Sequence, residues 1–122
     1  MGLYYKDEYY KVVGICMEVH RILGFGLAEI VYNDALEYEF TRRELLFERE
    51  KEYLVEYKDI ILKHKFYADF VVYDNIILEV KAISELTNVH FAQTVNYLRL
   101  AKGKLGIIVN FTTSLQHKRI IL

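Results

Sequence analysis

The sequence lacks several features that would assign it to a class of protein at once. Proline and tryptophan are absent, and Cys16 is the only cysteine, so neither an internal disulfide nor a CxxC metal site can form. A single thiol is typical of a reducing compartment, and we expect a cytoplasmic protein. No apolar run approaches the roughly 20 residues of a membrane span, and Met1–Lys6 lacks the apolar core of a signal peptide.

Net charge is also nearly absent. The 16 basic and 17 acidic residues give −1, so bulk charge does not indicate a nucleic-acid-binding protein. The basic residues nevertheless form local clusters. If several clusters converge around Asp69 in the fold, they could contact phosphates; otherwise they form an ordinary solvated surface. The groups are Arg42–Arg43, Lys63–Lys65, Lys102 with Lys104, and His117–Arg119.

The remaining composition is that of one globular domain. The chain has 122 residues, of which 53% are apolar and 27% charged, which excludes a disordered chain. A chain of this size can bury a core without disulfides or metals. We see no repeat, linker or low-complexity segment, so residues 1–122 are predicted to form a single domain.

Apolar periodicity predicts two helices in the first third of the chain. Helical spacing runs from about Tyr4 to Phe40 and ends near Thr41. The segment Gly24-Phe25-Gly26 interrupts it, because two glycines so close together disfavour a continuous helix. Cys16 lies on the apolar stripe of the first helix and is predicted to be a core residue.

The rest of the chain predicts strands, a third helix and a final strand. Strand-like patterns run from about residue 46 to 82, with one long half-polar strand over 48–57 and turns at 58–59 and 74–75. Helical spacing returns over 87–101, with Thr87 as N-cap and Gly103 as the stop, followed by an apolar strand over 105–111. The tail through Leu122 could add a last strand. The order α-α-β-β-β-α-β predicts an α/β fold with a mixed sheet flanked by helices.

Three charged residues in the strand region carry the chemistry. Glu79 and Lys81 are two apart on an otherwise apolar strand, so they point to the same face. Charges buried there need partners, and Asp69 on the preceding strand is the obvious candidate. A two-residue turn at 74–75 would place Asp69 and Glu79 on opposite faces, whereas a three-residue loop or a bulge would bring them together. A shared site therefore predicts an odd loop or a bulge.

Two carboxylates and an ammonium on one face suit a hard cation. Mg²⁺ or Mn²⁺ prefers carboxylate and carbonyl oxygens, and it polarises a phosphodiester and lowers the pKa of a bound water. The alternative is a partly exposed Glu79–Lys81 pair on a solvated strand face. A short charged motif alone does not decide between them.

The same residues resemble a known family. Asp69 followed by Glu79-Val80-Lys81 resembles the motif of the PD-(D/E)xK nuclease superfamily, whose fold is restriction-endonuclease-like. The segment Gly26-Leu27-Ala28-Glu29-Ile30-Val31-Tyr32 resembles the signature of the GxxExxY protein family, a small-protein branch of that superfamily. The likeness runs from about Val19 to Phe111. Ala68 stands where the superfamily name has proline.

The resemblance implies roles for six side chains and one carbonyl group. Asp69 and Glu79 would bind the metal with the Val80 carbonyl close by, and Lys81 would be the catalytic lysine. Glu29 resembles the helical acid that many of these nucleases bring to the metal. Gln93 and Tyr97 resemble a QxxxY element that contacts the metal shell or the nucleic acid backbone.

Each of these residues also has a structural interpretation. Glu29 could be a surface acid near a helix N-terminus, and Gln93 with Tyr97 could be the polar border of an amphipathic helix. Tyr32 is predicted to pack with its hydroxyl bonded at the edge of the core, and His90 to be a structural residue near a helix start.

Two functions follow from the sequence. The first is a metal-dependent nuclease that cleaves DNA or RNA, with nucleic acid, in the first place DNA, as its partner. So small a chain would need a homodimer or a protein partner for sequence preference. The alternative is a catalytically silent binding or assembly module with the same fold.

Overall fold

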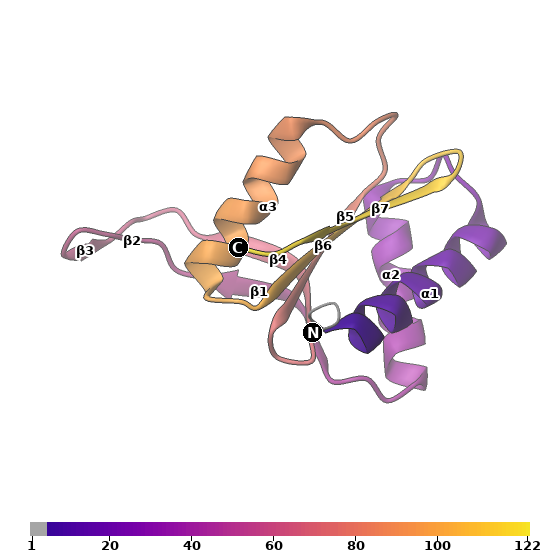
Figure 1. Cartoon of the computed structure of the whole chain (residues 1–122), viewed down its shortest axis with the longest axis horizontal. Helices are drawn as coiled ribbons and strands as arrows, with labels where there is room; N and C mark the ends of the chain where they lie inside the picture. Colours follow the sequence, from indigo (N-terminus) through magenta and orange to yellow (C-terminus); the bar gives the residue numbers. More distant parts are fainter. Residues whose placement is uncertain (1–4) are drawn as a thin grey trace.

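A five-stranded sheet between two layers of helices forms the body of the protein (Figure 1). The computed structural model describes residues 5–122, so Tyr4, where the helical spacing begins, and most of Met1–Lys6 lie outside them. The helices are α1 (Lys6–Leu23), α2 (Glu29–Arg42) and α3 (Asn88–Ala101). The strands are β1 (Phe47–Tyr53), β2 (Glu56–Tyr57), β3 (Ile60–Ile61), β4 (Phe66–Val72), β5 (Ile76–Lys81), β6 (Leu105–Phe111) and β7 (Leu115–Ile120).

The sheet is mixed, with strand order β1-β4-β5-β6-β7. Strands β5 and β6 run parallel because α3 connects them, and every other neighbouring pair is antiparallel. This confirms the predicted fold class and element order, and the tail adds β7 at one edge. None of the helices within residues 5–122 is long and apolar enough to cross a membrane.

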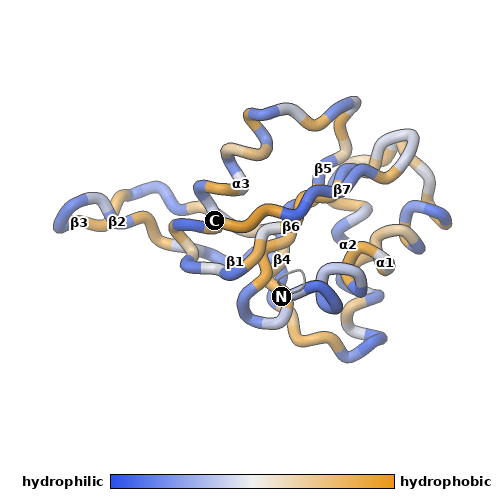
Figure 2. Tube along the Cα trace, viewed as in Figure 1, coloured by the Kyte–Doolittle hydropathy of each residue, from blue (hydrophilic) through white to orange (hydrophobic). Residues whose placement is uncertain are grey.

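Each face of the sheet has its own core. Helices α1 and α2 cover one face, where Tyr32, Phe40 and Phe70 are fully buried. Helix α3 covers the other face with a smaller core that contains Leu98, and Cys16 lies in the first core as predicted. Figure 2 shows hydrophobic segments running through the middle of the molecule and hydrophilic segments at its periphery.

The predicted long strand over residues 48–57 is divided in the structure. Strand β1 pairs with β4 as far as Tyr53, which lies opposite Phe66, and the chain beyond has no neighbour in the main sheet. Residues 56–57 pair instead with 60–61 across the predicted Lys58-Asp59 turn. The resulting β2–β3 hairpin projects from the body (Figure 1). Periodicity alone could not find this break, because both segments have a strand-like pattern.

Helix α3 ends just before Gly103, the predicted stop. The left-handed residue at this end is Lys102, at φ 56°. The Gly103 N–H donates to the Leu98 carbonyl at 3.0 Å. A Cβ atom on Gly103 would lie 2.8 Å from Leu98 Cδ1 and 3.2 Å from the Asn75 carbonyl oxygen. Glycine is therefore required here by lack of space.

This crowding predicts opposite effects for two glycine substitutions. Gly103→Ala should lower the free energy of unfolding by roughly 1–3 kcal/mol through overpacking. A Cβ atom on Gly14 in α1 would meet nothing within 4 Å, so Gly14→Ala should raise the free energy of unfolding by about 0.5–1 kcal/mol through helix propensity. Urea unfolding of both variants measures the two shifts. A Gly103→Ala protein as stable as the wild type would contradict the packing argument.

Candidate active site

Strands β4 and β5 separate at Asp69, and this separation creates the site. Their pairing runs from Val72 opposite Ile76 to Phe70 opposite Leu78 and then stops. Beyond it, Asp69 Oδ2 accepts the Val80 N–H at 2.7 Å, so a carboxylate takes the place of a backbone partner. The loop between the strands has three residues, 73–75, which confirms the odd loop required for a shared site.

The other side of β4 is irregular at the same level. Strand β1 pairs with β4 on both sides of Asp69, but the residue opposite Asp69, Glu50, is unpaired and has φ 53°. The side chains of β4 change faces of the sheet at this point. Ala68 packs in the core on the α3 side, whereas Phe70 packs in the core on the side of α1 and α2. In a regular strand these two side chains would share a face. Asp69 therefore lies where β4 passes from one core to the other.

Glu79 is the most constrained group of the site. It is only 5% exposed, and its Oε1 atom is buried without a hydrogen-bond partner among the described residues. Burial raises the pKa of the Glu79 carboxyl group, and the neighbouring Asp69 carboxylate raises it further, to about 9. The positive charge of Lys81 offsets only part of this increase. The neighbours Leu78 and Val80 point into the opposite core, as the strand alternation predicts.

Helix α3 brings Gln93 and Tyr97 to the same site. Gln93 Oε1 accepts a long hydrogen bond of 3.5 Å from Lys81 Nζ. The Tyr97 ring stacks on Phe66 with centroids 4.4 Å apart, and Phe66 stacks in turn on Tyr53 at 5.1 Å. Burial raises the pKa of Tyr97, and the charges of Glu79 and Asp69 add to this effect. The helix face predicted from the four-residue spacing therefore faces the carboxylates.

Glu29 is held at a distance from the two other acids. It is the first residue of α2, and its Oε2 accepts the Ala82 N–H at 3.4 Å, just past the end of β5. Within residues 5–122, no three His, Cys, Asp or Glu side chains are grouped so that they could hold a metal ion. The structure thus gathers Asp69 and Glu79 beside Val80, with Glu29 at the adjoining end of the strand.

Two residues with structural interpretations have the roles expected of them. Tyr32 is fully buried, and its hydroxyl donates to the Gly24 carbonyl at 2.8 Å. His90 belongs to a capping box with Thr87, because its Nδ1 accepts the Thr87 N–H at 2.9 Å. Thr87 is the predicted N-cap.

Sequence reasoning missed Asn110, which orders the chain beyond Lys81. Asn110 is fully buried at the register position beside Lys81. Its Oδ1 accepts the Ile83 N–H at 2.9 Å, and its Nδ2 donates to the Ile83 carbonyl at 3.0 Å and to Gln116 Oε1 at 2.9 Å. The signal was present in the sequence, since an amide in an almost wholly apolar strand needs partners.

The comparisons with known proteins agree with the fold that carries this site. The profile of the PD-(D/E)XK nuclease superfamily matches residues 6–120. The chain belongs to this superfamily. The crystal structure of SSO0001 matches with a TM-score of 0.58 at 23% identity, over 96% of this chain and 59% of that one. That similarity supports the fold, and this chain spans less than two thirds of the length of SSO0001. None of the curated proteins matches the chain.

The donor set fits the metal chemistry of the PD-(D/E)XK superfamily, whose members generally use divalent metal ions. Two adjacent carboxylates are hard oxygen donors. The partnerless Glu79 Oε1 and the raised pKa of its carboxyl group mark a place where negative charge lacks compensation. A divalent cation bound by Asp69 and Glu79 would provide that compensation.

The raised pKa of Glu79 predicts how stability depends on pH without metal. The folded protein keeps a proton on Glu79 between the ordinary pKa of 4.5 and about 9, whereas the unfolded chain releases it. The free energy of unfolding should therefore fall as pH rises from 5 to 8, by at most about 1.4 kcal/mol per pH unit. Chemical denaturation in EDTA measures this slope.

The matched variants are Glu79→Gln, which should reduce the slope, and Glu56→Gln, which removes an exposed carboxylate on β2 and should retain it. An unchanged slope in Glu79→Gln would show that Glu79 titrates normally in the folded protein.

Proposed function

We propose that this protein is a metal-dependent nuclease that hydrolyses phosphodiester bonds in DNA or RNA. The observation that carries the proposal is the Asp69–Glu79 pair in the gap between β4 and β5, with Glu79 buried and incompletely bonded. The superfamily membership supports the same function. Mg²⁺ is the ion we expect, with Mn²⁺ as a substitute, because the side-chain donors are carboxylate oxygens.

The residues would divide the work as follows. Asp69 and Glu79 would hold the ion, with the Val80 carbonyl close by, and the Val80 N–H already fixes one Asp69 oxygen. When bound, the ion supplies polarisation of the phosphodiester and acidification of a bound water. Lys81 orients the attacking water and stabilises the negative charge that develops on the phosphate.

The surrounding residues position these groups. Gln93 holds the Lys81 ammonium on the α3 side, and Tyr97 is fixed by its stacking on Phe66, within reach of a nucleic acid backbone. Glu29 ties the start of α2 to Ala82, one residue beyond Lys81, so it would act at the outer edge of the metal shell rather than beside Asp69 and Glu79. A cytoplasmic location, inferred from the single buried thiol of Cys16, would give the enzyme access to nucleic acid.

Substitution of the three motif residues tests the proposed function. Asp69→Asn, Glu79→Gln and Lys81→Ala should each lower the rate of Mg²⁺-dependent cleavage by at least about a hundredfold. The first two variants weaken the hold on the ion, and the third removes the positive charge that stabilises the developing negative charge. The assay uses labelled single-stranded DNA, double-stranded DNA and RNA, with EDTA as the metal-free arm. Glu56→Gln, with the same charge change on the projecting hairpin, should cleave at the wild-type rate. Cleavage by all three variants at that rate would refute the mechanism.

Metal binding can be measured without catalysis. A ligand that binds only the native state stabilises it, by about 2.7 kcal/mol at a hundred times its Kd, so Mg²⁺ or Mn²⁺ should raise the melting temperature of the wild type. The Asp69→Asn/Glu79→Gln double variant should show no such rise. Metal stabilisation without cleavage of any substrate would favour the catalytically silent module. No stabilisation and no cleavage would remove both the metal site and the nuclease.

A further inference from the structure

The turn between α1 and α2 is held in one conformation by a buried tyrosine. Gly24 (φ 72°) and Gly26 (φ 98°) take left-handed conformations that favour glycine. The Tyr32 hydroxyl donates to the Gly24 carbonyl at 2.8 Å and accepts the Leu27 N–H at 3.3 Å. The Tyr32 ring is fully buried and stacks on Phe111 with centroids 4.3 Å apart. The turn is therefore anchored to the core below it.

This anchored turn presents a large apolar side chain to solvent. Phe25, between the two glycines, is 60% exposed. With Gly26 it borders a hollow of about 420 Å³ whose other walls are residues 82–84 and 111–113. Figure 1 shows the α1–α2 turn and the β6–β7 loop at the same end of the sheet. The volume is within the roughly 300–1,000 Å³ of ligand sites.

The hollow adjoins the candidate active site. Its wall includes Ala82, the residue after Lys81. The Ala82 N–H donates a hydrogen bond to Glu29 Oε2. Asn110 fixes the next residue, Ile83, through both of its backbone polar groups. Ser84 and Thr113 add hydroxyl groups to the lining. An aromatic ring and hydrogen-bonding groups thus lie beside the strand that carries the proposed catalytic lysine.

We propose that this hollow binds an unpaired nucleobase next to the cleaved phosphate, with the base stacked on Phe25. The proposal rests on the proposed nuclease function and specifies its substrate as a single strand or a frayed end. Aromatic rings stack on the face of any base, and hydroxyl and backbone groups bond to its edge. A base inside a duplex could not enter, because its faces and edge are already occupied.

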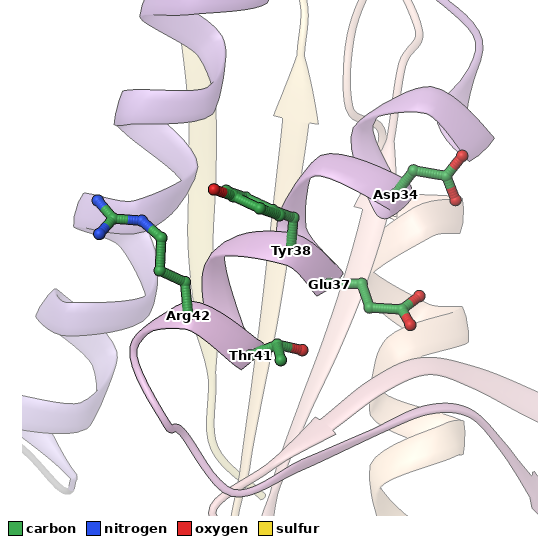
Figure 3. A pocket seen from close by; sticks show the side chains of 5 residues that line it. All are labelled: Asp34, Glu37, Tyr38, Thr41 and Arg42. Atoms are coloured by element: carbon green, nitrogen blue, oxygen red, sulfur yellow. The ribbon is translucent and has the colours of Figure 1, made fainter.

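A second hollow of the molecule also has an aromatic ring and a hydroxyl group, but charged side chains line it as well. It measures about 500 Å³ and lies on α2, where Asp34, Glu37, Tyr38, Thr41 and Arg42 line it (Figure 3). Its two carboxylates outnumber the one guanidinium group of Arg42, and this negative balance disfavours a polyanion. Its exposed Tyr38, at 64%, provides an aromatic position that resembles Phe25 in exposure but differs in surroundings.

Because the chain has no tryptophan, Phe25→Trp places a single tryptophan at the hollow, and its fluorescence can be excited selectively over that of the 11 tyrosines. In EDTA, which prevents cleavage, a twelve-nucleotide single-stranded DNA should quench this fluorescence saturably. A strand of equal length with abasic sites, or a blunt duplex, should cause less than about one fifth of the quenching that the intact single strand causes. Tyr38→Trp is the matched control and should respond to none of them. A twelve-nucleotide RNA distinguishes a ribose-tolerant site from a DNA-only one, and either result supports the proposal provided the DNA quenches.

A second measurement uses affinity. Phe25→Ala should weaken the binding of a labelled single strand about tenfold, which corresponds to 1.4 kcal/mol, and should not change the melting temperature of the protein, since the ring is exposed.

Equal quenching by intact and abasic strands, equal responses of both tryptophan variants, or no binding at all would overturn the proposal. Mg²⁺-dependent cleavage without Phe25→Trp quenching would reject the base site and leave the nuclease intact. Quenching without cleavage or metal stabilisation would reject the nuclease and leave a base-binding module.

Discussion

The arrangement of the whole site depends on one hydrogen bond, from the Val80 N–H to the Asp69 carboxylate. Two antiparallel strands would normally continue their backbone pairing, and a carboxylate between them would have no room. Here the pairing of β4 and β5 ends at Phe70 and Leu78, and the side chain of Asp69 satisfies the N–H that the separation exposes. The same separation leaves Glu79 buried next to a second carboxylate. A gap in the sheet therefore both creates the site and leaves in it a buried carboxyl group whose ionised form lacks compensation.

The rest of the fold supports this gap from two sides. On one face, α3 covers the gap with Tyr97, whose ring is fixed in a stack with Phe66 and Tyr53. At the end of β5, Asn110 and Glu29 replace the missing sheet contacts with side-chain bonds to Ile83 and Ala82. Side chains thus take over where backbone pairing stops, which is typical of a site that must be both open and rigid.

The segment Gly26–Tyr32 receives a physical explanation of the same kind. Its tyrosine anchors a turn, its glycine permits that turn, and its glutamate bonds to Ala82, just past the end of β5. These residues lie far from Asp69 in sequence, but Glu29 reaches the end of β5, the strand next to the one that carries Asp69. The resemblance to the GxxExxY family stays a prediction, whereas membership of the PD-(D/E)XK superfamily rests on the match over residues 6–120.

Local periodicity and strand alternation were enough to predict the helices, the central strands and the shared face of Glu79 and Lys81. They also required an odd loop or a bulge between β4 and β5, if Asp69 was to join these two residues. Tertiary contacts were needed to show that β4 changes faces at Asp69, that β1 ends at Tyr53, and that crowding favours glycine at position 103. They were also needed to show that Glu29 stands apart from the carboxylate pair. Those features depend on which segments distant in the chain become neighbours, and local patterns carry no information about a neighbour's position.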